Sequence, residues 1–137
     1  MSVPLHPIAA LKAALRAHLL ADADVAALLG AAIHDVPPRG ASPPYLAFGE
    51  ALARDNGTVE RDGAILELDL VAVTTERGSE AALAIASAVA TALGGNLPAL
   101  EEHRLVALDI RRTATRHDPA TSLTRATLRL SAFTEPL

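Results

Sequence analysis

The second half of the chain constrains the fold most, because its hydrophobic pattern changes twice along its length. Apolar and polar residues alternate over residues 64–74, 105–115 and 123–134, which is typical of strands with one buried face. Between the first two lies an alanine-rich run, residues 79–93, that carries no charge beyond its second residue and ends at Gly94. Glycine at such a position is typical of a helix C-terminus. The pattern therefore predicts strand, helix, strand and strand.

The first half predicts a helical hairpin followed by strands. Apolar residues at helical spacing indicate a helix over residues 8–20, and a shorter helix is expected over residues 24–29, between an acidic N-cap and a glycine. Residues 33–36 have the pattern of a short edge strand. Residues 37–44 contain four prolines, so they are expected to form a surface loop before a strand over residues 45–53.

The polar segment at residues 54–63 is expected to join two strands as a long hairpin loop. Hairpin loops usually take about two to five residues, so a functional or partly disordered role is predicted for this segment. Together these elements predict a single α+β domain over residues 1–137. Its sheet is expected to be antiparallel, or mixed, with about four main strands and helices packed on one face. The predicted core face of the strands carries Leu66, Leu68, Leu70, Val106, Leu108, Ile110, Ala126, Leu128 and Leu130.

The helix at residues 79–93 has no polar face, so it is expected to be buried on all sides. In a chain of 137 residues one side of this helix must be covered by the other helices or by another subunit, and both are expected. Only Tyr45, Phe48 and Phe133 are aromatic, so the core must be built from small aliphatic side chains. Oligomerisation would complete such a core.

Composition excludes several classes of protein. The absence of cysteine excludes disulfides and thiolate metal sites, and the net charge of −4 argues against a dedicated nucleic-acid binder. No secretory signal is visible, and the longest uncharged run is interrupted by glycines and a proline, so a soluble cytoplasmic protein without membrane contact is expected. No histidine pair has metal-ligand spacing, and no serine lies in a nucleophile elbow. We therefore expect no enzyme activity, no metal and no cofactor.

Arginines concentrate in the last third of the chain and allow two interpretations. In one, they pair across strands with Glu67, Asp69 and Asp109 on a solvated face. In the other, they form a basic surface lining a channel through which DNA passes, contacting phosphates without reading bases. The arginines concerned are Arg104, Arg111, Arg112, Arg116, Arg125 and Arg129.

Several short stretches carry a resemblance to a known family. In chain order they are residues 11–20, residues 24–30, Ile33-His34, Pro44-Tyr45-Leu46, residues 66–73, Gly78-Ser79-Glu80-Ala81, Leu93 with its glycine stop, His103-Arg104-Leu105-Val106, and residues 124–133 followed by Thr134-Glu135-Pro136. In order and spacing the chain resembles the tail-completion, or tail-terminator, family of long-tailed bacteriophages and gene transfer agents.

The resemblance implies an α+β subunit that forms a ring, commonly hexameric, at the head-proximal end of a tail tube. Such a ring stops tube polymerisation and forms part of the neck that joins the tail to the capsid. The implied partners are further copies of the chain, the tail tube protein and a head–tail connector or other neck protein, with DNA passing through the lumen. The implied location is the tail neck of a virion or gene-transfer-agent particle assembled in the host cytoplasm. The family has no catalytic residues.

Three groups of residues are our candidates for contacts in such a ring. On the uncharged helix, the candidates for subunit contacts are Leu83, Ala86, Val89 and Ala90. In the polar loop, the candidates for tail-tube contact are Arg54, Asp55, Asn56, Glu60 and Arg61. For the lumen, or for ion pairs between subunits, they are Arg111, Arg125 and Arg129.

Two other functions remain open from the sequence. One is a head–tail connector, which shares the neck but binds a different ring. The other is a small dimeric α+β module that binds a ligand, which would need a pocket with convergent polar groups.

Overall fold

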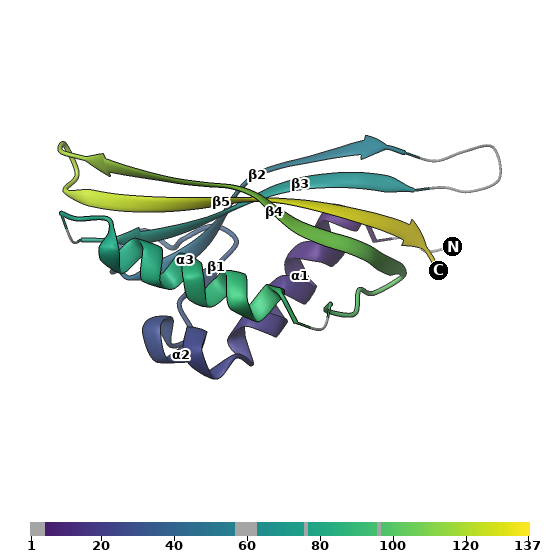
Figure 1. The fold of residues 1–137 in the computed structure, drawn as a ribbon, viewed down its shortest axis with the longest axis horizontal. Helices are drawn as coiled ribbons and strands as arrows, with labels where there is room; N and C mark the ends of the chain where they lie inside the picture. The colour runs from purple at the N-terminus through teal and green to yellow at the C-terminus, as the bar shows by residue number, and fades with distance from the viewer. Residues whose placement is uncertain (1–4, 57–62, 76, 96) are drawn as a thin grey trace.

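The computed structural model describes residues 5–56, 63–75, 77–95 and 97–137. These residues form three helices and five strands (Figure 1). In chain order the elements are α1 (Pro7–Leu20), α2 (Ala23–Leu29), β1 (Ile33–His34), β2 (Tyr45–Asp55), β3 (Ala64–Thr74), α3 (Glu80–Leu93), β4 (His103–Asp118) and β5 (Leu123–Pro136).

The five strands form one mixed sheet in the order β1-β2-β3-β5-β4. The short β1 runs parallel to β2, and every other neighbouring pair is antiparallel. The expected antiparallel or mixed sheet is confirmed, with β1 as a fifth strand beside the four main ones. After β3 the chain crosses through α3 to the far edge, and β5 then fills the position between β3 and β4. All three helices lie on one face of the sheet, as predicted (Figure 1).

Local signals in the sequence define the helix ends. The Asp22 side chain accepts the backbone N–H groups of Asp24 and Val25, each at 3.0 Å, and so caps α2. Gly30 ends α2 with a φ of 60°, which glycine adopts without the steric cost of a Cβ. The imidazole Nδ1 of His6 accepts the backbone N–H of Ile8 at 3.0 Å, and α1 begins at Pro7, one residue earlier than expected.

The core lies between the helices and the two central strands, β3 and β5. Alternate residues of both strands point at the helices and are buried, and α1 adds Leu11, Leu15 and Leu19 from one stripe. Each fully buried leucine contributes about 1.5–3 kcal/mol of hydrophobic stabilisation. On the central strands the buried residues are Leu66, Leu68, Leu70, Ala126, Leu128 and Leu130, as predicted.

The predicted core face of β4 was wrong for two of its three residues. Val106 and Ile110 were expected on the core face, but their exposed fractions are 43% and 36%, and only Leu108 is half-buried against the core. Two physical causes explain the difference. β4 is the edge strand, while α3 lies mainly against β3 and β5. In addition, irregularities at 105/107 and 110/112 shift the register of β4 along β5.

The uncharged helix α3 is buried along one face only. Ala82, Ile85 and Val89 lie in the core, whereas Leu83 and Ser87 are exposed. The expected burial on all sides is therefore not met within one subunit. The sheet and the other helices cover one face of α3 and leave the other face uncovered by the described residues.

Candidate assembly interface

The sheet face opposite the helices, which we call the open face, holds a charged pair at its centre. Asp69 on β3 and Arg129 on β5 are direct cross-strand partners. Arg129 Nε donates to Asp69 Oδ1 at 2.9 Å and Nη2 donates to Oδ2 at 3.1 Å, so the pair is bidentate. Glu50 Oε2 lies 3.9 Å from the same guanidinium. The hydrogen bonds and the charge of Asp69 raise the pKa of Arg129 above its ordinary value.

Two like-charged pairs stand beside this ion pair. Arg112 on β4 lies opposite Arg129, and Arg116 lies opposite Arg125. Like charges directly opposite each other on adjacent strands destabilise a sheet. We call these four residues the arginine patch. They lie along the β4–β5 hairpin on the open face. Arg112, Arg116 and Arg129 line a shallow depression of about 260 Å³ together with Asp69 and Thr127.

The turn of this hairpin is held by an acidic side chain. Asp118 Oδ1 accepts the backbone N–H of Ala120 at 2.9 Å. This hydrogen bond, followed by one to Thr121, lowers the pKa of Asp118 below its ordinary value, and the charge of Arg125 adds to the effect. The turn therefore favours an ionised carboxylate next to the arginine patch.

Two of the three lumen candidates belong to the arginine patch, and one does not. Arg125 and Arg129 lie on the open face, whereas Arg111 lies at the irregularity in β4, with its Nη2 3.7 Å from Asp109 Oδ2. Arg112 and Arg116 belonged to the arginine set of the sequence analysis but not to its three lumen candidates. Counting back by twos along β4 from the turn after Asp118 would have placed both on the open face, because the register is regular from Asp118 back to Arg112.

The candidates on α3 divide into buried and uncovered residues. Ala86 and Val89 are 4% and 0% exposed, so the core of the subunit itself already covers them. Ala90 is half-buried, and Leu83 is 36% exposed. Of the four candidates, Leu83 presents the most surface for contact with another chain.

Three of the five candidates for tail-tube contact lie at the end of β2. Arg54 and Asp55 belong to β2, because the strand runs two residues further than expected, and the exposed Asn56 follows. Glu60 and Arg61 lie outside the described residues. This end of β2 and the β4–β5 turn are at opposite ends of the sheet (Figure 1).

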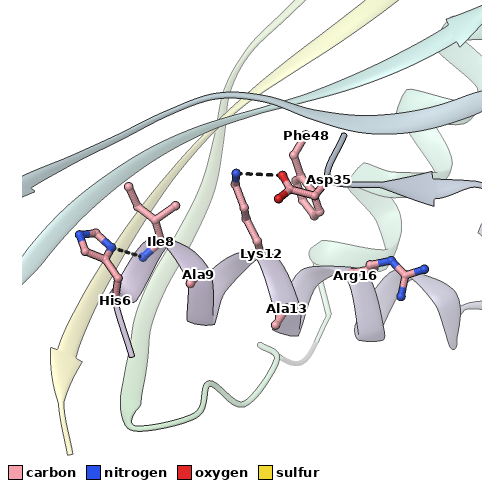
Figure 2. A pocket seen from close by; sticks show the side chains of 8 residues that line it. All are labelled: His6, Ile8, Ala9, Lys12, Ala13, Arg16, Asp35 and Phe48. Carbon is pink, nitrogen blue, oxygen red and sulfur yellow. Dashed lines mark hydrogen bonds and ion pairs between the residues drawn. The ribbon is translucent and has the colours of Figure 1, made fainter. Parts of the chain in front are cut away.

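A groove of about 520 Å³ runs between α1 and the outer edge of β2 (Figure 2). Ile8 and Phe48 give it apolar walls. Lys12 Nζ lies 3.0 Å from Asp35 Oδ1 and 5.9 Å from the centroid of the Phe48 ring. Lys12 and Asp35 are thus paired with each other, and the third charged residue of the groove, Arg16, donates from Nε to the Ile33 carbonyl at 2.9 Å. The full lining is His6, Ile8, Ala9, Lys12, Ala13, Arg16, Asp35 and Phe48.

Neither a metal centre nor a membrane-spanning helix is found in the described part of the chain. No group of three or more histidine, aspartate or glutamate side chains in residues 5–56, 63–75, 77–95 and 97–137 could hold a metal ion. No helix formed by these residues has the length and apolar character needed to cross a bilayer.

Comparisons with known proteins agree with this geometry. Residues 13–135 match the model of the family described as tail completion protein gp17. Among solved structures, the chain is similar to a chain in the virion of a native gene transfer agent particle, with 32% sequence identity and a TM-score of 0.87. The alignment covers 96% of this chain and 99% of that chain, so the likeness extends over nearly the whole fold. No curated protein matches.

Proposed function

Because the chain belongs to the tail completion protein gp17 family, we propose that it is a tail terminator, which caps the head-proximal end of a tail tube. Family membership confirms the resemblance drawn from the sequence, and it makes the chain a structural tail protein rather than an enzyme. The match over residues 13–135 is the observation that carries the proposal. The virion location of the similar chain supports a place for this protein in a phage or gene-transfer-agent particle.

In the proposed assembly, six copies join head to tail into a closed ring. A heterologous interface of this kind closes whenever the rotation between neighbours divides the full circle. The ring would cover the last ring of the tail tube and leave it no surface on which to add further subunits. Its other side would form part of the neck and meet a head–tail connector or another neck protein.

The surfaces described above take different roles in this assembly. The tip of the β2–β3 hairpin, with Arg54, Asp55 and Asn56, is the proposed contact with the tail tube. Leu83 and Ala90 on α3 are proposed to face another subunit. The arginine patch is proposed to face the lumen, where guanidinium groups would contact passing phosphates without reading the bases. Ring symmetry would place one copy of the patch per subunit around the lumen.

A tube-growth assay tests the proposal. The tail tube protein from the same particle is polymerised with increasing amounts of this chain, and tube length is measured by electron microscopy. A terminator shortens the tubes as its ratio to tube protein rises, because capped ends stop growing. Tubes of unchanged length would contradict the proposal. Binding to a capsid portal or connector ring without any effect on tubes would indicate a connector instead.

A further inference from the structure

The sheet has two edges along which the described residues provide no neighbouring strand. One is the outer edge of β4. The other is most of β2, because β1 pairs only with Leu46 and Ala47, so residues 48–54 have β3 on one side and no described strand on the other. We call residues 48–54 the free edge of β2. Unpaired backbone N–H and C=O groups along such edges are a template for pairing with another chain.

The two edges run in opposite directions. β2 is antiparallel to β3, β3 to β5, and β5 to β4, so β2 and β4 are antiparallel to each other. A second copy placed head to tail, with its strands in the same direction, would therefore bring its β2 beside β4 of the first copy as an antiparallel neighbour. Antiparallel pairing is slightly more stable per residue than parallel pairing, because its hydrogen bonds run perpendicular to the strands.

Rows of paired residues that run across the sheet connect the free edge of β2 directly to β4. Leu52 pairs with Glu67, Glu67 with Ser131, and Ser131 with Asp109. In the next row toward the β4–β5 turn, Ala51 is linked in the same way to Ile110. The free edge of β2 and the first half of β4 thus lie at the same height along the strands, so a neighbour needs no large axial shift to align them.

Apolar surface is exposed at both edges over this same height. On β4, Val106 and Ile110 are 43% and 36% exposed, and on β2, Leu52 is 47% exposed. Beside the free edge lies the groove walled by Ile8 and Phe48, which has room for side chains of an added strand. A neighbouring β4 placed along this edge would bury Val106 and Ile110 against those walls. The alternating pattern of β4 would then place these two side chains in apolar surroundings, which a single subunit does not provide.

The charges of the two edges are complementary. β4 carries four arginines against Asp109 and Asp118, a net charge of +2 with its histidines neutral. Strand β2 as a whole carries Glu50 and Asp55 against Arg54, a net charge of −1. Unlike charges across an interface favour this pairing and disfavour the pairing of two β4 strands with each other.

We propose that β4 of one copy pairs antiparallel with the free edge of β2 of the next copy, so that the sheet continues from subunit to subunit. The inference rests on the proposed ring, and it names the strands that close it. Irregularities at 48/51 in β2 and at 105/107 and 110/112 in β4 interrupt both edges. Such bulges protect an edge from arbitrary strands, so they restrict pairing to a partner edge of matching shape.

Engineered cysteines test the pairing, because the chain contains none of its own. Leu52→Cys is combined in turn with Ala107→Cys, Asp109→Cys and Ala114→Cys, all placed on the open face by the register. A disulfide forms only where the two Cα atoms lie about 4.4–6.8 Å apart, so each cysteine pair can link in one register only. The three pairs therefore sample three different registers. Each double variant is oxidised mildly in the presence of tail tubes. At least one should give a ladder of linked subunits that ends at the ring, while every single variant stays unlinked.

The outcomes separate this inference from the proposed function. Rings that form and cap tubes while no pair cross-links would overturn the strand pairing and leave the terminator function standing. Cross-linking of a single β4 variant with itself would also overturn it, because that result means twofold pairing of β4 with β4. Absence of any oligomer, with tube growth unaffected, would overturn both.

A charge placed on the edge gives a second readout. Ile110→Lys puts an ammonium group where the neighbouring groove is expected to cover an apolar side chain, so the copies should associate roughly tenfold more weakly. Leu28→Lys, on the 41% exposed Leu28 of α2, is the matched control because α2 contributes to neither edge. Circular dichroism checks that both variants fold, and sedimentation measures association. Equal association of the two variants would contradict the pairing.

Discussion

Arg129 and Asp69 face each other across the two central strands of the sheet, joined by hydrogen bonds of 2.9 and 3.1 Å. The Asp69 side chain is only 14% exposed, so this pair is partly shielded from solvent. It offsets part of the positive charge of the arginine patch. Arg129 therefore stabilises the folded subunit, whereas Arg112 and Arg116, which lie opposite other arginines, do not. Substitutions at these positions can separate effects on folding stability from effects on assembly.

Removal of Asp69 should destabilise the subunit. Asp69→Asn withdraws the negative charge and leaves Arg129 opposite Arg112, with Glu50 at 3.9 Å as the nearest acid. After allowance for solvent screening, we expect a loss of about 1 kcal/mol in the free energy of unfolding, measured by urea denaturation. Asp109→Asn is the control, since its pair with Arg111 is exposed and 3.7 Å long. An equal loss in both variants would contradict the central role of Asp69.

Removal of the outer arginines should have the opposite effect on stability. Arg112→Ala relieves a like-charge pair with Arg129, so the free energy of unfolding should stay unchanged or rise by a few tenths of a kcal/mol. If the patch faces the lumen, the assembled ring should at the same time lose part of its salt-dependent affinity for DNA. Arg39→Ala, in the loop before β2, is the control that leaves this affinity intact. Unchanged DNA affinity after Arg112→Ala would argue against a lumen role.

Acid should weaken the β4–β5 turn. The pKa of Asp118 is lowered in the folded protein, so its contribution to stability is fully present above the unfolded pKa of about 4 and is lost as pH falls through the folded value. Asp118→Asn keeps an acceptor for the Ala120 N–H but cannot titrate. Between pH 5 and pH 2, the protection of the turn amides against hydrogen exchange, corrected for the intrinsic rate at each pH, should fall more in the natural chain than in the variant. Parallel acid responses would rule out Asp118 as the cause.

The two faces of α3 should respond differently to a charge. Val89→Glu places a carboxylate at a position that is 0% exposed, which should cost several kcal/mol and prevent folding. Leu83→Glu, on the uncovered face, should leave the circular dichroism spectrum and the melting temperature nearly unchanged. If Leu83 contacts another subunit, the second variant should still fail to form rings. A folded Val89→Glu variant would show that the packing of α3 described above is wrong.

The sequence predicted the bounds of the strands better than it predicted which elements pack beside them. Residues 64–74 were predicted as a strand and form β3 with the same bounds, because their alternation is complete. The exposure of β4 could not be predicted, since it depends on β5 entering the sheet between β3 and β4.

Charged contacts were harder still to predict. Pairing of arginines with Asp69 was one of the two interpretations, but which arginine pairs depends on register, and a shift of one residue moves a side chain to the other face. The irregularity at 110/112 introduces such a shift, which places Arg112 rather than Arg111 on the same face as Asp109. The composition of the patch therefore required the structure.

Electron cryo-microscopy of tail tubes grown with this protein tests the terminator function most directly. The account predicts density for a closed ring of this domain at one end of each tube, with the β2–β3 hairpin toward the tube. It also predicts β4 of each copy beside β2 of the next. Tubes with both ends bare, or with the protein bound along their length, would contradict the terminator function.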